Sequence, residues 1–329
     1  MLDTMVTMVQ PAVIAEAVRL ACRAPSLHNS QPWLWVLDGD RLELYVDETR
    51  AVHTDQSGRE ALISCGAVLD HLRVAMAAAG WHAVVDRFPN PNQPQHLASI
   101  GFTALDYVTD GQHRRADAIL ARRSDRLPLL APAGWDAFET VLRARIAESA
   151  VRLQTLPEAV RPQLAEAAQL TESLRLYDSA YHAELDWWTA PFEVSDGIPQ
   201  SALVSAAESD RVEVGRAFPV IQRPERRTEI GVDWSTIVML STDEDSRAAA
   251  LACGEVLSTV LLECTLAGLA TCPLTHLTEL PASREILAAL TGHGDLPQIL
   301  IRVGVAPTLD ETPPATPRRP LEDVLRITR

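Results

Sequence analysis

Two long stretches of the chain are apolar on the spacing of a helix. In residues 58–79 the apolar positions recur in steps of three and four, and residues 246–267 are apolar almost throughout. This spacing predicts two long helices that are covered on most sides. The same pattern predicts further helices at residues 11–24, 112–122, 135–148, 157–187 and 282–290.

Shorter segments that alternate in polarity or are rich in β-branched residues predict strands. Residues 33–37 and 41–47 flank the turn Asp38-Gly39-Asp40, which predicts a hairpin. The remaining predicted strands are residues 81–88, 96–104, 151–156, 235–240 and 298–305. Residues 189–232 are irregular and charge-rich, residues 271–276 are predicted to form a loop, and the chain ends in a proline-rich tail.

The two long predicted helices resemble each other in sequence. Cys65-Gly66 aligns with Cys253-Gly254 at a shift of 188 positions, and further identities follow without a gap. These are Val68 with Val256, Leu69 with Leu257, and Gly80 with Gly268. Two helices rich in alanine and leucine can match by chance, but the flanking elements also follow in the same order, which favours an internal duplication. We therefore expect an α+β fold of two fused lobes, residues 1–110 and 111–329, with antiparallel-dominated sheets and a central helix pair.

The charge and cysteine content narrow the classes of partner. A net charge of −15 argues against a nucleic acid or an anionic membrane as partner, because both require a basic surface. The 5 cysteines include no Cys-x-x-Cys pair, which indicates reduced thiols and no metal site. The sequence has no uninterrupted apolar run of about 18 residues and no basic N-terminal signal, so we expect a cytoplasmic protein.

The most specific motif is the segment Ala24-Pro25-Ser26-Leu27-His28-Asn29-Ser30-Gln31-Pro32-Trp33, between a predicted helix and a predicted strand. It resembles the APSxxNxQPW loop of flavin nitroreductases. Short serine and asparagine side chains supply neutral donors and acceptors at fixed positions, which a flavin ring requires. The alternative is an ordinary helix-to-strand turn rich in turn-forming residues.

A second motif, Arg122-Arg123-Ser124-Asp125-Arg126, follows a predicted helix. It resembles the RRSxR motif that binds the FMN phosphate in the same superfamily. Guanidinium groups pair with phosphate oxygens bidentately, and a serine hydroxyl adds a neutral donor. By position in the motif, Arg122, Ser124 and Arg126 would face the phosphate, whereas Arg123 need not. On its own, such a cluster is also typical of a solvated helix end.

Two further segments extend the resemblance. Pro317-Arg318-Arg319-Pro320-Leu321-Glu322 is similar to the C-terminal segment of nitroreductases, in which a basic residue contacts the same phosphate. The alternative is a frayed basic tail. Gly268-Leu269-Ala270-Thr271-Cys272-Pro273-Leu274-Thr275-His276 is similar to the segment along the reactive edge of the flavin, although the family commonly has acidic residues or glycine where this chain has Thr275-His276. His276 could contact a ligand or could be an ordinary surface histidine.

The resemblance runs from about residue 12 to the C-terminus and is greatest to the Acg family, a fused two-lobed branch of the nitroreductase superfamily. It implies a nitroreductase-like fold, an intramolecular pseudo-dimer and bound FMN. The implied FMN-binding residues are Pro25, Ser26, Leu27, Asn29, Gln31, Arg122, Ser124, Arg126, Pro273, Leu274, Thr275, His276, Arg318 and Arg319. The first lobe has the PSxxN loop and the second the arginine motif, so only one composite flavin site can form. The chain could then be a monomer or a homodimer.

The functional prediction is an FMN-dependent oxidoreductase that uses NAD(P)H or a small electron acceptor, with the flavin as the redox group and no catalytic side chain or metal. A segment of about residues 187–232, with Trp187, Trp188, Phe192 and Phe218, could cover the flavin as a lid or could form a peripheral helical hairpin. An arginine between residues 223 and 227 could stabilise the reduced ring. The alternatives are a flavin-storage protein whose lid prevents turnover and a flavin-consuming synthase.

Overall fold

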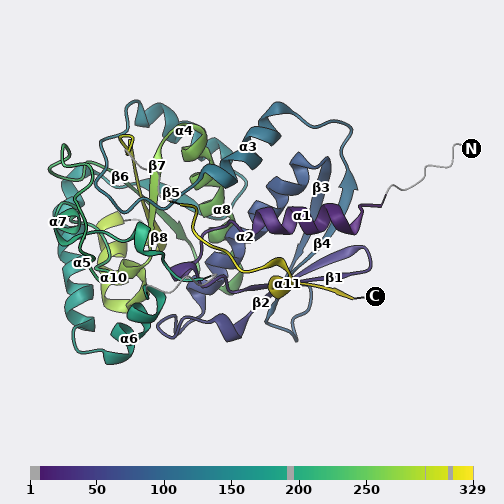
Figure 1. Ribbon diagram of the computed structural model, residues 1–329, viewed down its shortest axis with the longest axis horizontal. Helices are drawn as coiled ribbons and strands as arrows, with labels where there is room; N and C mark the ends of the chain where they lie inside the picture. The colour runs from purple at the N-terminus through teal and green to yellow at the C-terminus, as the bar shows by residue number, and fades with distance from the viewer. Residues whose placement is uncertain (1–7, 191–195, 293, 310–313, 329) are drawn as a thin grey trace, which may run out of the picture.

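Two β-sheets lie on either side of a central pair of helices (Figure 1). The computed structural model describes residues 8–190, 196–292, 294–309 and 314–328. The first sheet has the order β3-β4-β2-β1-β9 and the second β5-β6-β8-β7. The strands are β1 Trp33–Asp38, β2 Arg41–Val46, β3 Trp81–Arg87, β4 His96–Ala104, β5 Arg152–Thr155, β6 Thr236–Thr242, β7 Ala270–Leu274, β8 Leu296–Gly304 and β9 Leu325–Thr328.

The helices cover the sheets and separate them. They are α1 Pro11–Ala21, α2 Arg59–Ala78, α3 Asp110–Ala121, α4 Trp135–Arg145, α5 Arg161–Arg175, α6 Ser179–Trp188, α7 Ala206–Asp210, α8 Arg247–Leu266, α9 His276–Glu279, α10 Pro281–Thr291 and α11 Leu321–Val324. Helix α2 packs on β2 and β3, and α8 packs on β6, β7 and β8. The apolar faces predicted for these two helices are therefore buried by the sheets and by each other.

The two halves share one topology, as expected from the matching helices. Helices α2 and α8 have 20 residues each, and their bounds differ by the same 188 positions as the sequence match. Around them the strand orders β3-β4-β2-β1 and β7-β8-β6-β5 are equivalent, and every pairing within these two sets is antiparallel. Even the register shifts fall between equivalent strand pairs, β2–β4 and β6–β8. The predicted α+β fold of two fused lobes is confirmed.

The central helices touch backbone to backbone where they cross. A Cβ atom on Gly66 would lie 2.0 Å from the carbonyl oxygen of Leu251, and one on Gly254 would lie 2.0 Å from the carbonyl oxygen of Ile63. Only glycine allows this separation. Along the same contact, the Ser258 hydroxyl donates to the Asp70 carboxylate at 2.6 Å, and this pair also spans 188 positions. The matched residues of the sequence repeat are thus the ones that join the lobes.

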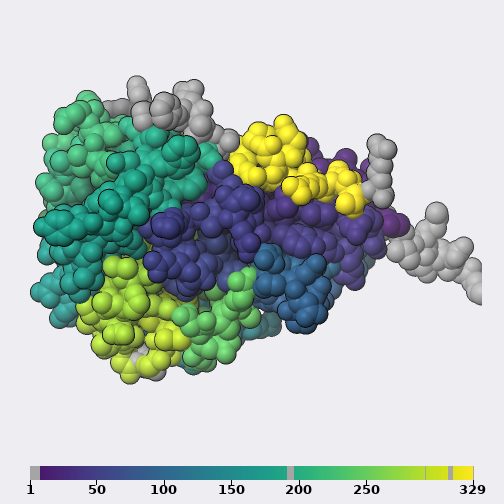
Figure 2. All heavy atoms as spheres, turned by 90° about the horizontal axis from the view of Figure 1, so that it is seen from below, coloured from purple at the N-terminus to yellow at the C-terminus, as the bar shows by residue number. Residues whose placement is uncertain are grey.

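The C-terminal segment returns from the second lobe to the first. Strand β9 pairs in parallel with β1, and Val324 before it is 1% exposed. In Figure 2 this last segment, in yellow, lies on the N-terminal third of the chain, in purple. The described residues of the tail therefore dock on the first lobe, which contradicts the frayed tail that the sequence also allowed. The strand itself was not predicted, because four residues carry too little periodicity to indicate one.

Three predicted elements differ from the structure. Residues 271–276 were predicted as a loop, but Thr271 and Pro273 lie in β7, which tolerates proline because it is an edge strand. The single helix predicted over residues 157–187 is divided into α5 and α6, and the Asp178 carboxylate caps the second by accepting from the Tyr181 amide at 3.0 Å. The irregular segment includes α7, which begins at a capping box of Ser205 and Glu208.

Helices α2 and α8 are long and apolar enough to span a membrane by length and composition, with mean hydropathies of 1.4 and 1.6. In the fold, 83% and 72% of these windows are buried inside the protein. Each helix therefore has the environment of a core helix. This arrangement explains why the two most apolar segments of the chain lack a polar face.

The helix crossing generates a prediction. We expect Gly66→Ala and Gly254→Ala each to lower the free energy of unfolding by about 1–3 kcal/mol, because the added methyl group forces apart two packed backbones. Gly111→Ala is the matched control, since its Cβ would meet only the Thr109 hydroxyl at an ordinary 3.7 Å. Urea denaturation of the three variants measures the difference. Equal stability of Gly66→Ala and the control would contradict the close crossing.

Candidate functional site

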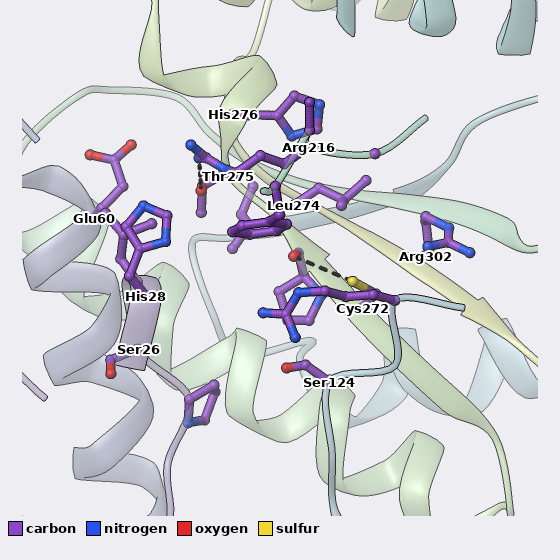
Figure 3. Close-up of a pocket in the computed structure, with 18 of the residues that line it drawn as sticks. Ser26, His28, Glu60, Ser124, Arg216, Cys272, Leu274, Thr275, His276 and Arg302 are labelled. Carbon is purple, nitrogen blue, oxygen red and sulfur yellow. Dashed lines mark hydrogen bonds between the residues drawn. The ribbon is translucent and has the colours of Figure 1, made fainter. Parts of the chain in front are cut away.

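A cleft between the lobes contains two adjoining cavities. We call the first the inner cavity; it lies between the loop after α1, the start of α2, β7 and part of the segment 204–218 (Figure 3). The second, the arginine cavity, is lined by arginines of both lobes and by residues 197–204. The two share Pro25, Ser26, His28, Ser124, Arg126 and Val204. A ligand that is flat at one end and anionic at the other would fit such a pair.

The loop after α1 has a constrained backbone. His28, Asn29 and Gln31 have φ angles of 50°, 58° and 53°, in the left-handed region that side chains other than glycine disfavour by about 1 kcal/mol each. Hydrogen bonds keep this shape: the Ser26 hydroxyl accepts from the Gln31 amide at 3.0 Å. The Leu27 amide donates to the Ser64 hydroxyl of α2 at 3.2 Å. Backbone strain of this kind concentrates at functional sites.

The predicted residues of this loop divide into two groups. Pro25, Ser26 and Leu27 line the inner cavity. Asn29 lines the arginine cavity, where its side-chain amide donates to the Gly197 carbonyl at 3.0 Å. Gln31 lines neither cavity. It is fully buried, donates to the Asn29 carbonyl at 3.2 Å, and accepts from the backbone of Arg319 at 2.9 Å. Gln31 therefore supports the loop through these hydrogen bonds and does not line the cleft.

Four arginines gather at the far end of the arginine cavity: Arg23, Arg122, Arg123 and Arg318. Among the described residues, their guanidinium groups donate to carbonyl oxygens. Arg318, for example, donates to Cys22 at 2.8 Å, and Arg23 donates to Thr316 at 2.9 Å. Burial, followed by the charges of Arg123 and Arg23, lowers the pKa of Arg122 to about 10. Burial and the same neighbours lower the pKa of Arg318 well below its usual value. The cluster is therefore an electrostatically unfavourable group of cations.

Arg122 is the most exceptional member of this cluster. It is 6% exposed, and its Nε and Nη1 atoms have no hydrogen-bond partner among the described residues. Its Nη2 atom donates to the Arg23 carbonyl at a long 3.4 Å. Burying a guanidinium with two nitrogens left without acceptors costs several kcal/mol. An anion bound at this position would offset that cost.

The rest of the arginine motif is tied to β7. Ser124 forms a parallel bridge with Thr271, and the Asp125 amide donates to the Thr271 carbonyl at 2.8 Å. The Asp125 carboxylate accepts from Arg227 at 2.6 Å, which balances the charge of that arginine. Ser124 and Arg126 line both cavities. The Arg126 guanidinium lies over the Phe218 ring, 5.0 Å from its centre.

The two C-terminal arginines occupy different environments. Arg318 lines the arginine cavity. Arg319 lines neither cavity; it pairs with Asp47 at 3.4 Å and donates to the Asp323 carbonyl at 2.9 Å. The sequence left open which of the two would contact a phosphate, and this geometry favours Arg318.

The segment around the end of β7 forms the back of the inner cavity, with Pro273, Leu274, Thr275 and His276 in its lining. His276 is fully buried, and neither ring nitrogen has a hydrogen-bond partner among the described residues. Burial and the nearby Arg216 lower its pKa to about 3, so the imidazole is neutral near pH 7. His276 is thus not the surface histidine that the sequence also allowed.

Part of the segment 187–232 covers the cleft. Val204, Ser209, Val212 and Phe218 line the inner cavity, while Phe192 lies outside the described residues. Arg216 anchors this cover: it contacts the Glu279 carboxylate, which also accepts from Arg175 at 3.2 Å. Burial acts to raise the pKa of Glu279, but the charges of Arg216 and Arg175 and the hydrogen bond from Thr275 hold it at about 2.

The cover also contacts the first lobe. Arg50 contacts Asp196 and lies over the Trp188 ring, 5.8 Å from its centre, and the Glu184 carboxylate accepts from the Thr54 amide at 2.9 Å. Residues of α6 and of the following segment therefore bridge the lobes at the cleft.

Several lining residues were not predicted from the sequence. Arg23, His28, Glu60 and Arg216 line one or both cavities. His28 stood inside the first motif and could have been named from it. The other three have no local motif, because their positions depend on how distant elements pack.

Comparisons with known proteins identify relatives of the chain by sequence. No protein-family profile matches the chain. A Mycobacterium tuberculosis protein named as the NAD(P)H nitroreductase acg is 59% identical over 322 residues, which cover 98% of this chain and 97% of that protein. Another protein of that species, also named as an NAD(P)H nitroreductase, is 37% identical over 323 residues, covering 94% of this chain and 91% of the relative.

Two solved structures are similar at lower identity. The FMN-dependent nitroreductase NfnB of Mycobacterium smegmatis, in complex with NADPH, matches at 18% identity and a TM-score of 0.41, over 67% of this chain and 100% of that one. A Bacteroides fragilis nitroreductase with bound FMN matches at 15% identity and a TM-score of 0.36, over 61% of this chain and 95% of that one.

The buried Glu279 network predicts an acid-sensitive cover. A carboxyl whose pKa is held at about 2 stabilises the fold while it is ionised, so this contribution is present above about pH 4.5 and is lost as the pH falls towards 2. We expect Glu279→Gln to lower the free energy of unfolding at pH 7 by about 3 kcal/mol. Its difference from the parent protein should shrink between pH 5 and 2.5, measured by denaturation across that range.

The exposed Glu213 provides the control for the same change of charge. Glu213→Gln should track the parent protein at every pH. A Glu279→Gln deficit that stays constant into acid would show that Glu279 contributes by packing alone.

Proposed function

Because the chain belongs to the Acg family of nitroreductase-like proteins, we propose that it is an FMN-dependent oxidoreductase that takes electrons from NADH or NADPH. Its relatives of 59% and 37% identity are named as NAD(P)H nitroreductases, and the chain matches each of them over nearly its whole length. The single observation that carries the proposal is the buried guanidinium of Arg122, whose Nε and Nη1 have no hydrogen-bond partner among the described residues, in a cavity completed by the PSxxN loop of the other lobe.

The residues of the arginine cavity fit the phosphate of FMN. A phosphate dianion would accept from the free Nε and Nη1 of Arg122 and offset the mutual repulsion of Arg122, Arg318 and Arg23. Ser124 adds a neutral donor beside them. In the part of the chain that the structure describes, these three arginines donate to carbonyl oxygens and to no carboxylate.

The inner cavity fits the flavin ring at the other end of FMN. Its walls are mainly apolar, from Ile63, Leu257 and Leu274, with neutral histidines among them. When bound there, the flavin would accept a hydride from the nicotinamide and pass it to a small acceptor. The protein would hold the ring with the Ser26 loop and exclude water with the cover near Phe218.

We propose one such site per chain, since the sequence has a single PSxxN loop and a single arginine motif of this kind. The lobes that contribute them are residues 1–110 and 111–329, with residues 187–232 as the lid, and one chain suffices to complete the site. The cytoplasm, which supplies NAD(P)H and keeps thiols reduced, would be the place of action.

A storage protein is the second candidate, and one observation favours it. The cover is tied at Glu279 in the second lobe and near Arg50 in the first, so it could retain the flavin and block the acceptor. Storage and turnover require the same phosphate contacts, and they differ only in whether the bound flavin exchanges electrons with small molecules.

Flavin binding tests the composite site. We expect the protein saturated with FMN to hold one flavin per chain, and Arg122→Ala to bind it about ten- to a hundredfold more weakly, because it loses charge-assisted hydrogen bonds. Without flavin, Arg122→Ala should unfold no more easily than the parent protein, since it removes an unpaired buried cation. Flavin absorbance after dialysis and thermal denaturation measure the two effects.

Arg319→Ala is the matched control, because Arg319 lies in the C-terminal motif but outside both cavities. It should keep its flavin. Two flavins per chain, or full retention of yellow colour by Arg122→Ala, would refute the composite site.

The second prediction tests turnover. We expect anaerobic addition of NADPH to bleach the flavin absorbance of the holoprotein within seconds, and a nitroaromatic compound to restore it. Sodium dithionite is the control that confirms that the flavin can be reduced. Yellow colour that persists with NADPH but disappears with dithionite would reject the enzyme in favour of storage.

A further inference from the structure

Glu60 occupies a wall between two cavities. It is in the first turn of α2 and is 3% exposed. One side of this wall is the inner cavity, where Figure 3 draws Glu60 on the same side as His28 and Ser26. The other side is a lateral cavity lined by charged residues that include His53, Asp178, Asp245 and Arg284. Among the described residues, Glu60 alone lines both cavities.

The surroundings of Glu60 favour a protonated carboxyl. Burial and the neighbouring Asp55 raise its pKa well above the usual range, with Glu279 acting in the same direction and Arg59 against it. Arg59 contacts Glu60, but it also donates to the carbonyl oxygens of Gln298 at 2.6 Å and of Thr278 at 2.8 Å. Its charge is thus shared with the second lobe and does not belong to Glu60 alone.

The other titratable residues around the inner cavity are poor proton donors at neutral pH. Burial and nearby arginines lower the pKa values of His28 and His276 to about 3, so both are already deprotonated. Burial raises the pKa of the Cys272 thiol. The lining arginines retain their protons in proteins. Glu60 is therefore the group on this wall whose proton can be released and replaced.

Hydride transfer creates a need for such a proton. A two-electron acceptor such as a quinone, Q, becomes the anion QH⁻ when it receives a hydride, and neutral QH₂ forms only when one further proton arrives. Reduction of a flavin by NADPH requires no such proton, since the hydride alone is transferred. A proton donor at the inner cavity would thus act in the second half of the reaction and not in the first.

We propose that Glu60 delivers this proton: its carboxyl O–H bond breaks as the new O–H bond of the acceptor forms, and water in the lateral cavity reprotonates it. The inference rests on the proposed function, because a reduced flavin must supply the hydride. It assigns to Glu60 a role that its contact with Arg59 alone would not require.

The competing reading is that Glu60 is only the structural partner of Arg59. Glu60→Gln distinguishes the two, because the amide keeps the size and can accept from Arg59 but cannot release a proton. In the holoprotein reduced anaerobically with one equivalent of NADPH, we expect this variant to reduce p-benzoquinone about a hundredfold more slowly. Bleaching by NADPH should proceed at the parent rate.

The pH profile supplies a second signature. In the parent protein the rate of quinone reduction should be constant at low pH and should fall as the pH rises through the pKa of Glu60, since only the protonated carboxyl donates. The profile of Glu60→Gln should be flat, and Glu60→Asp should recover a falling profile. Glu285→Gln, which removes an exposed carboxylate at the lateral cavity, is the matched control and should behave like the parent.

A spectroscopic measurement does not depend on turnover. The infrared spectrum of the purified protein at pH 7 should contain a protonated carboxyl band that is lost in Glu60→Gln and shifts in D₂O. Absence of this band, or equal quinone rates and profiles for Glu60→Gln and the parent, would overturn the relay alone. A protein that binds no flavin, or whose flavin NADPH does not bleach, would overturn the proposed function and the relay with it.

Discussion

The close crossing of α2 and α8 is the constraint on which the rest of the structure depends. At Gly66 and Gly254 the two backbones approach so closely that a Cβ atom at either position would lie 2.0 Å from a carbonyl oxygen of the other helix. Each helix carries its own sheet, so this contact sets the distance between the lobes. The cavities at the lobe interface inherit their walls from it: Glu60 and Ile63 come from α2, and Leu257 comes from α8. A wider crossing would open the cleft to water and separate the two halves of the site.

The site itself is built at a cost in stability. Arg122 is buried without acceptors for two of its nitrogens, and the surrounding arginines repel one another. The backbone at His28 and Asn29 is in the left-handed region. The nearby carbonyl oxygens that accept from Arg318 and Arg23 orient these side chains but do not neutralise them. Such arrangements persist when a ligand balances the charge, because the binding free energy then offsets the strain.

Buried ion pairs between arginines and carboxylates hold the elements around the site in place. Arg302 and Asp233 pair at 2.5 Å in the second lobe, and the same arginine donates to the Leu127 carbonyl beside the arginine motif. Arg216, Glu279 and Arg175 fasten the cover, and Arg59 joins α2 to the second lobe. Buried pairs of this kind contribute little net stability but specify one arrangement, since breaking one leaves an uncompensated charge. The arginines paired with carboxylates thus fix the arrangement of the elements around the cleft.

Local sequence determined the long helices, most strands, the internal repeat and the two motifs at the cleft. These features depend on periodicity and on short runs of residues, which a linear reading detects. It also named Arg122, Ser26 and Asn29, which line the two cavities in the structure, because the motif and the side chain coincide. Only the tertiary structure separated Arg318 from Arg319, placed Gln31 beneath the loop, and turned residues 270–274 into an edge strand. It also revealed Glu60 and Arg216, whose surroundings depend on contacts between distant segments. Arg59, which contacts Glu60, donates to the Thr278 carbonyl of the second lobe, and Arg216 contacts Glu279 from another element. Charge balance and cavity walls arise from contacts between distant segments, and no local pattern of residues records them.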